Sequence, residues 1–316
     1  MVATCEGKWF IRSIAILRHT TSEQTVIEAL PLFPEFSALT MDHAATVMKY
    51  TEPFAVYCDF TFAVLWCWGM DRCRLSDLNG NLVIQLPDYT SGQLFMSFIG
   101  RQKVHETIES LFGMIKESDC FLPYLQYVPE DNLTGISLAE SYQLTEDRNN
   151  SDYICDLSIL SKMAGNQYER VRNMTNRFQK TYHWQAKEID LREPKHWNDV
   201  MRLFTSWKEG SNLDLGTFSS VFERILPLTE RIHIISIGLY VEKKLIGFSI
   251  NEPKQADYVN CLFANTDTSY TGASAFLYKQ TGILLLENGY RYLNNPSCHL
   301  SGDEDRIRNM IFQAAN

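Results

Sequence analysis

The chain has 316 residues, of which 45% are hydrophobic and 21% charged, and its formal net charge is −9. This composition excludes a disordered chain, and the length exceeds what one hydrophobic core usually organises, so we expect two domains. A uniformly acidic protein would be a poor partner for nucleic acid, but here the charge is uneven. Residues 1–150 hold 10 Lys and Arg against 19 Asp and Glu, whereas residues 151–316 hold 19 of each. A local basic cluster in the second part can therefore still meet a phosphate backbone.

Membrane spans, export signals and metal sites find no support in the sequence. No apolar run reaches the roughly 18–20 residues of a membrane span, and the short apolar stretch after Glu6 lacks a small-residue cleavage site. The eight cysteines form no C-x-x-C pair and the seven histidines no HExxH spacing. We therefore expect reduced thiols, no metal, no resident cofactor and a cytoplasmic protein, with a peripheral contact to a membrane left open.

Hydrophobic periodicity and turn signals predict a series of helices and strands in the first part of the chain. Three helical patterns come first, over residues 22–33, 41–50 and 59–68. A hairpin follows, because two strand patterns flank Asn79-Gly80, the strongest short hairpin signal. The series continues with a strand over 94–99, an amphipathic helix over 101–118 and a strand over 121–128.

The second part of the chain repeats this order. Helical patterns over 193–210 and 217–228 precede a hairpin joined at Glu242-Lys243-Lys244. A strand over 258–264, a helix over 272–289 and a strand over 290–294 then follow. Matching elements of the two series are offset by about 170 residues.

This order of elements is that of the GNAT acyltransferase fold. We expect an α/β fold of two tandem GNAT-like domains, each a mixed, largely antiparallel sheet flanked by helices. The charged, Asn-rich segment 146–152 predicts the boundary. It separates an N-terminal domain over 1–150, in which 1–35 form an extension of unclear role, from a C-terminal domain over 151–316.

One stretch, "GNQYERVRNMTNRFQKTY" from Gly165 to Tyr182, combines three arginines, a lysine and three asparagines. On a helix, Tyr168, Arg172, Asn176 and Lys180 form one row of side chains, and Glu169, Asn173 and Arg177 form the neighbouring row. A solvated polar face is the simplest interpretation. However, asparagine is a mediocre helix former, so the composition favours a face with binding partners.

This stretch resembles the signature of the phosphatidylglycerol lysyltransferase C-terminal domain family, in which a Gly-x-x-Tyr-x-x-x-Arg-Asn-x-x-Asn-Arg-Phe-x-Lys pattern follows a strand and a short helix. The matching positions are Gly165, Tyr168, Arg172, Asn173, Asn176, Arg177, Phe178 and Lys180. Similarity extends from about residue 36 onward, including "CDFTFAVLWCW", "KLIGFSINEP" and "GYRYLN". The resemblance implies a tandem GNAT fold and transfer of an amino acid from aminoacyl-tRNA to a lipid head-group hydroxyl.

Acyl transfer needs an acceptor that loses its proton, a polarised carbonyl and a place for negative charge. Glu252, at a strand end, is our first choice for a base or for binding the donor's ammonium group, against the alternative of a solvated carboxylate. Tyr270 and Asn294 can donate hydrogen bonds to ester oxygens. We expect phosphate of tRNA or of a lipid head group at Arg172, Arg177 and Lys180, with Tyr168, Asn173, Asn176 and Gly272 in the same binding site.

The loop "SYTGAS" stands where GNAT enzymes carry a Q/R-x-x-G-x-G/A motif for coenzyme A. Gly272 is in register, but Ser269 replaces Gln or Arg and Ser274 replaces Gly or Ala. The half-kept loop favours an aminoacyl-tRNA donor over acyl-coenzyme A, although a helix N-terminus with a small packing residue explains it equally well.

Two further features bear on function. The aromatic residues Phe54, Phe60, Phe62, Trp66 and Trp68 can line an acceptor tunnel between the repeats, but core packing is the simpler interpretation. The chain ends in "DRIRNMIFQAAN", in which Arg308 can match a family arginine, but the lysine and tyrosine of the family's ending are absent and we expect no final strand.

The leading hypothesis is therefore an aminoacyl- or acyltransferase. A non-catalytic GNAT-like module for a phosphorylated ligand or protein partner, and a coenzyme A dependent N-acyltransferase, are the alternatives.

Overall fold

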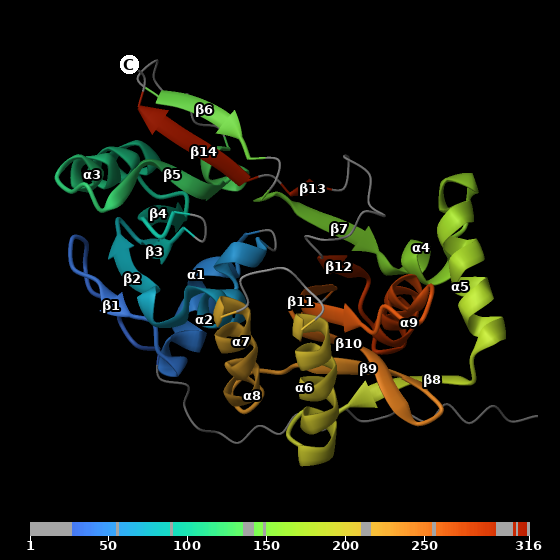
Figure 1. Cartoon of the computed structure of the whole chain (residues 1–316). Coiled ribbons are helices and arrows are strands. Elements are labelled where there is room, and N and C mark those ends of the chain that lie inside the picture. The colour runs from blue at the N-terminus through green and yellow to red at the C-terminus, as the bar shows by residue number, and fades with distance from the viewer. Residues whose placement is uncertain are drawn as a thin grey trace, which may run out of the picture.

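The computed structural model of the chain contains two seven-stranded mixed sheets with helices packed against them (Figure 1). It describes residues 27–54, 57–88, 91–134, 142–147, 150–209, 216–254, 257–294, 306–307 and 309–314. Both sheets are mixed because each contains one parallel strand pair, β4 with β5 and β11 with β12, among antiparallel neighbours. The expected tandem GNAT-like fold is confirmed.

The first sheet has the strand order β1-β2-β3-β4-β5-β14-β6. Its strands are β1 (Ser37–Ala38), β2 (Arg74–Leu78), β3 (Asn81–Pro87), β4 (Leu94–Ile99), β5 (Phe121–Pro129), β6 (Tyr142–Glu146) and β14 (Asn309–Ala314). The helices of this part are α1 (Ala44–Thr51), α2 (Phe62–Gly69) and α3 (Val104–Lys116). The β2–β3 hairpin turns at Asn79 and Gly80, both with positive φ, which is the turn that this dipeptide predicts.

The second sheet has the strand order β13-β7-β12-β11-β10-β9-β8. Its strands are β7 (Asp152–Asp156), β8 (Trp184–Ile189), β9 (Ile235–Val241), β10 (Lys244–Pro253), β11 (Tyr258–Thr266), β12 (Tyr292–Asn294) and β13 (Arg306–Ile307). The helices are α4 (Leu157–Lys162), α5 (Glu169–Thr181), α6 (Pro194–Glu209), α7 (Gly216–Glu223), α8 (Ile225–Leu228) and α9 (Ala273–Glu287). Helices α4 and α5 both pack on α9.

The last strand corrects the sequence analysis, which expected none. Strand β14 lies between β5 and β6 in the first sheet, although the strand before it, β13, pairs with β7 in the second. Consecutive strands β6 and β7 likewise belong to different sheets. The chain therefore passes between the sheets twice, and residues 309–314 lie outside the sheet that holds the other described strands of residues 151–316.

The helix predicted over 22–33 is wrong for its described residues. Residues 27–33 form no helix, and Leu32 instead makes an isolated bridge with Asp77. Pro31 and Pro34 explain the error, because each removes a backbone donor and disfavours a helical preceding residue. Residues 22–26 and Arg308 lie outside the described residues.

One apolar core runs through both parts of the chain. Phe60 and Phe62 of the first part are fully buried in the same cluster as Phe222 and Phe248 of the second. Core packing, rather than a tunnel, is therefore the role of Phe62. The contact fixes the two sheets against each other, since separating them would expose a large apolar surface.

Arg224 joins the two parts at the edge of this core. Its Nε donates to the Trp66 carbonyl at 2.7 Å, and Trp66 Nε1 donates back to the Arg224 carbonyl at 3.1 Å. The guanidinium also stacks 3.9 Å from the Trp66 ring and pairs with Asp71 at 3.0 Å. The Arg224 side chain thus combines a hydrogen bond, a cation–π contact and an ion pair.

We predict that Arg224→Ala lowers the free energy of unfolding by about 2 kcal/mol, because it leaves a carbonyl without its donor and removes a cation–π contact. Urea titration measures this change. Arg202→Ala is the control, since Arg202 makes an exposed pair with Asp199 and should change the value by less than about 0.5 kcal/mol. Equal effects of the two variants would contradict the role given to Arg224.

Candidate active site

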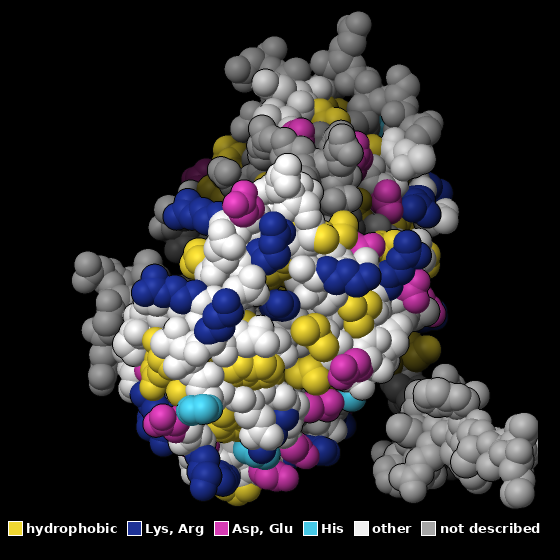
Figure 2. All heavy atoms as spheres, turned by 90° about the vertical axis from the view of Figure 1, so that its right-hand side faces the viewer, with side chains coloured by type: hydrophobic (Ala, Val, Ile, Leu, Met, Phe, Trp, Pro, Cys, Tyr) yellow, Lys and Arg dark blue, Asp and Glu magenta, His cyan; other side chains and the backbone are white. Residues whose placement is uncertain are grey.

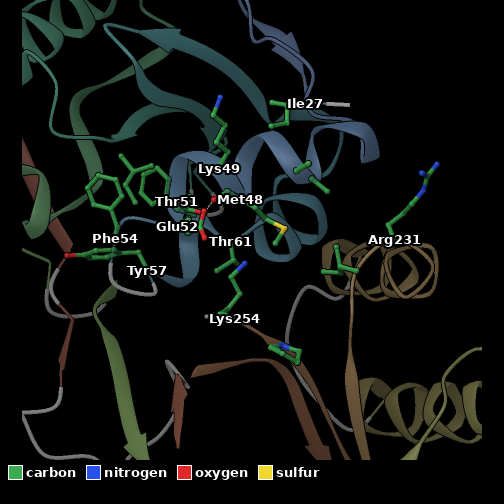
Figure 3. A pocket seen from close by; sticks show the side chains of 16 residues that line it. Ile27, Met48, Lys49, Thr51, Glu52, Phe54, Tyr57, Thr61, Arg231 and Lys254 are labelled. Carbon is green, nitrogen blue, oxygen red and sulfur yellow. Dashed lines mark hydrogen bonds between the residues drawn. The ribbon is translucent and has the colours of Figure 1, made fainter. Parts of the chain in front are cut away.

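A cavity of about 740 Å³ lies where the two parts of the chain meet (Figure 3). Its wall comes from α1, from the segment before α2, from the end of β4, from the loop after α8 and from the end of β10. Most of the lining is apolar, namely Ile27, Ala44, Ala45, Met48, Phe54, Tyr57, Phe60, Ile99, Ile232 and Pro253. The cavity thus suits a ligand with an apolar portion, and Phe54 and Phe60 are the two expected tunnel residues that reach it.

Lys254 brings a positive charge to this cavity. Its side chain points from the end of β10 toward Thr61, while Lys49 and Arg231 point away from it (Figure 3). Its Nζ lies 3.2 Å from Glu252 Oε1, and the side chains are only 12% and 4% exposed. The two residues meet because side chains two apart on a strand share one face. Burial raises the pKa of Glu252, and Lys254 opposes that rise.

Glu252 begins a row of buried polar side chains across the second sheet. It lies opposite Asn260 on β11, which lies opposite Asn294 on β12. All three residues are at most 3% exposed. Asn260 Nδ2 donates to Thr61 Oγ1 at 3.4 Å, so the row contacts the first part of the chain. The structure therefore brings Glu252 and Asn294, predicted separately, into one cluster.

Asp152 extends the row onto β7. It is fully buried, its Oδ2 accepts a hydrogen bond from the Cys58 N–H at 3.1 Å, and Asn294 also hydrogen-bonds it. Burial raises the pKa of Asp152 to about 6, and the hydrogen bonds from Cys58 and Asn294 oppose the rise. The cluster therefore contains two carboxyl groups, Asp152 and Glu252, and one amine, Lys254.

Tyr270 lies away from this cluster. Lys244 Nζ sits 5.7 Å from the centre of the Tyr270 ring, and Lys244 is the first residue of β10, whereas Glu252 is near its end. Eight residues of extended strand span about 26 Å. The structure thus separates Tyr270 and the N-terminus of α9 from Glu252 and Asn294.

Gly272 adjoins helix α5 rather than open space. Its φ of 87° is positive, and a Cβ there would come within 2.9 Å of the Met174 carbonyl. Glycine is therefore required for close packing of α9 on α5. Nearby, the Asp267 carboxylate accepts a hydrogen bond from the Ser269 N–H at 3.1 Å and pairs with Lys244 Nζ at 3.1 Å, so this loop N–H already has a partner.

Arg172 binds the chain's own backbone. Its Nη1 donates to the Met163 carbonyl at 2.7 Å and to the Gly165 carbonyl at 2.9 Å, so it fixes the turn between α4 and α5. Tyr168 is half-buried against the core beneath α4. These two members of the predicted phosphate row thus have structural contacts.

Four other predicted binding residues are exposed on α5: Asn173, Asn176, Arg177 and Lys180. Asn173 and Arg177 line a second hollow, of about 610 Å³, together with Asn166, Gln167, Glu169, Arg170 and Met174. The predicted site residues therefore divide into a buried group beside the cavity and an exposed group on α5.

The sequence analysis missed Lys254, Thr61 and Asp152. A signal for Lys254 was present, because "NEPK" places it two residues after Glu252 on a strand. Thr61 and Asp152 reach the cluster only through the packing of distant segments. In the described part of the chain, no group of three His, Cys, Asp or Glu is placed to hold a metal ion.

The family model described as "Phosphatidylglycerol lysyltransferase, C-terminal" matches residues 54–315. No curated protein sequence matches the chain at a significant level. Among the residues that the structure describes, no helix has both the length and the apolar character needed to cross a membrane.

Several solved structures share the fold. A conserved protein of unknown function from Bacteroides thetaiotaomicron has a TM-score of 0.73 and 20% identity, covering 89% of this chain and 99% of its own. The C-terminal domain (DUF2156) of a putative lysylphosphatidylglycerol synthetase from Agrobacterium fabrum has a TM-score of 0.60 and 9% identity. This match covers 88% of the present chain and 93% of that domain. L-PGS from Bacillus licheniformis has a TM-score of 0.52 and 14% identity, and the match covers 78% of this chain and 85% of that one.

We predict that Asp152→Asn removes part of the pH dependence of stability. The pKa of Asp152 is higher in the folded chain, at about 6, than its ordinary 3.8, so folding favours the protonated form. That stabilisation is complete below about pH 4 and is lost as the pH rises through about 6. The amide keeps the acceptor for Cys58 but cannot ionise.

Unfolding free energies measured from pH 4 to 7 should therefore fall less steeply for Asp152→Asn, by a difference on the order of 2 kcal/mol. Asp119→Asn, at an exposed carboxylate that makes no ion pair among the described residues, is the control. Parallel pH profiles of wild type and Asp152→Asn would show that Asp152 keeps an ordinary pKa.

Proposed function

Because the chain belongs to the phosphatidylglycerol lysyltransferase C-terminal family, we propose that it transfers an aminoacyl group from aminoacyl-tRNA to a hydroxyl or amine acceptor bound in the cavity. The observation that carries this proposal is the buried Glu252–Lys254 pair, whose amine faces a largely apolar cavity. An apolar wall with one buried cation suits an acceptor that has an apolar part and an anionic or polar head. A lipid, with apolar chains and a polar head group, meets that description.

The chemistry requires stabilisation of negative charge at one oxygen. The acceptor oxygen or nitrogen attacks the ester carbonyl, and a tetrahedral oxyanion forms. Its collapse breaks the bond to the ribose oxygen of the donor, and that oxygen takes up the proton that the acceptor loses. The Lys254 ammonium, held in a site poor in water, is placed to stabilise the oxyanion.

Glu252 acts through Lys254 in this proposal. Its carboxylate lies behind the amine, 3.2 Å from Nζ, and is itself almost fully buried. A negative charge at that distance attracts the ammonium group and fixes its direction. Asn260 lies opposite Glu252 on β11 and its Nδ2 donates to Thr61 Oγ1 at 3.4 Å, so both residues border the pair. Glu52, on the opposite cavity wall, is a carboxylate that can receive the donor's ammonium group.

Acyl-coenzyme A is the less favoured donor. The Met174 carbonyl lies where a Cβ of residue 272 would stand, and the Ser269 N–H of the same loop already donates to Asp267. An RNA donor does not need this loop. No role in the transfer is assigned to Tyr270, because it lies at the other end of β10.

We predict that Lys254→Met lowers the rate of aminoacyl transfer by about 10²-fold, the usual cost of removing one donor to an oxyanion. The assay follows radiolabelled amino acids from a mixture of charged tRNAs into extracted lipids and small amines. Lys195→Met, at an exposed lysine of α6, should leave the rate unchanged. If no charged tRNA loses its label in the presence of wild-type protein, the proposed function is wrong.

We also predict that Glu252→Gln lowers kcat on the order of tenfold with little change in KM, because it removes the charged partner that directs Lys254 Nζ. A purely structural role would reduce the amount of folded protein, measured by circular dichroism, and leave kcat of the folded enzyme unchanged. Glu193→Gln is the matched control, since the Glu193 side chain is 63% exposed.

A further inference from the structure

The outward face of α5 carries a row of donors different from the one expected from the sequence. Arg172 turns to the backbone of the preceding turn, so it leaves that face. Arg170, Asn173, Arg177 and Lys180 are exposed, and their spacings of three, four and three residues place them along one side of the helix. From Arg170 to Lys180 the row extends about 15 Å along the helix axis.

The cations of this row are not used in ion pairs within the described part of the chain. Among the described residues, no ion pair involves Arg170, Arg177 or Lys180, and the one carboxylate that lines the adjoining hollow is Glu169. Five other arginines pair with carboxylates: Arg101 with Asp131, Arg192 with Asp190, Arg202 with Asp199, Arg224 with Asp71 and Arg231 with Asp42. The row on α5 is therefore open to an anion from outside the chain.

The hollow beside the row supplies amide donors. Asn166, Gln167 and Asn173 line it together with Arg170 and Arg177. Viewed from the side on which α5 lies, Lys and Arg side chains extend across the middle of the surface (Figure 2). Arginine, lysine, asparagine and glutamine are the side chains that bind backbone phosphates in nucleic-acid complexes.

The geometry points to this face of α5 as the surface that binds the phosphate backbone of an RNA. The inference rests on the proposed function, because that reaction takes its aminoacyl group from an RNA. A row about 15 Å long can contact several successive phosphates. An anionic membrane fits less well, because the apolar side of α5 is already used: Phe178 is fully buried, with its ring 4.7 Å from that of Phe276 on α9.

The test is binding of an unfractionated, uncharged tRNA mixture, followed by fluorescence anisotropy over a series of salt concentrations. The variant is the triple substitution Arg170→Gln, Arg177→Gln and Lys180→Gln. We expect it to weaken binding at least tenfold at low salt and to reduce the slope of log affinity against log salt by about 2 to 3, since three phosphate contacts are lost. The control, Lys187→Gln, Lys195→Gln and Arg202→Gln, removes the same charge from β8 and α6 and should bind as wild type does.

The outcomes separate this inference from the proposed function. Absence of RNA binding by the wild type, or equal loss in the two triple variants, overturns the α5 surface. The α5 surface is also overturned if its triple variant loses binding to vesicles of anionic lipid but binds RNA as the wild type does. Lys254→Met should bind RNA normally while transfer fails. If α5-dependent RNA binding persists but no transfer is found with any donor, the surface stands and the proposed function does not. Circular dichroism confirms that each variant is folded.

Discussion

The charged pair of Glu252 and Lys254 lies almost out of water where two apolar-packed sheets meet, and the rest of the site depends on it. Removing such a pair from water costs several kcal/mol, which mutual attraction and hydrogen bonds must offset. Lys254 Nζ donates to Glu252 Oε1, and Asn260 of the second sheet and Thr61 of the first part of the chain border the pair. The apolar contact between the parts keeps this environment dry, while the cavity gives a ligand access to the amine of Lys254. Two sheets are therefore needed to build one site.

Much of the architecture could be predicted because its signals are local. Asn79-Gly80 determines a turn by itself, and helical periodicity identifies helices such as α3 and α9. The place of β14 could not be predicted, because it pairs with β5 and β6, more than 160 residues earlier in the chain. Lys254 was not predicted as a site residue, because Pro253 marks the end of a strand and a lysine after a strand is usually exposed. Burial, rather than residue type, makes that lysine a candidate site residue.

In helix α5, the sequence pattern predicts the helix but not which of its polar side chains are available for binding. Its pattern correctly predicted an amphipathic helix with a polar face, but could not tell which polar side chains the fold itself would use. Arg172 donates to the carbonyls of Met163 and Gly165 in the turn after α4. Helices α9 and α5 pack closely at Gly272, where a Cβ would meet the Met174 carbonyl. What remains exposed is a narrower row of cations. The protein thus has two separate regions of chemistry, a buried pair at the junction and a basic helix face.

The most direct test of the central claim is a crystal structure of the protein with a non-hydrolysable aminoacyl-adenosine, in which an amide replaces the reactive ester. The account predicts that the aminoacyl carbonyl oxygen lies within hydrogen-bond distance of Lys254 Nζ, inside the cavity between the two parts. Density for the analogue at the N-terminus of α9, beside Gly272 and Tyr270, would contradict it.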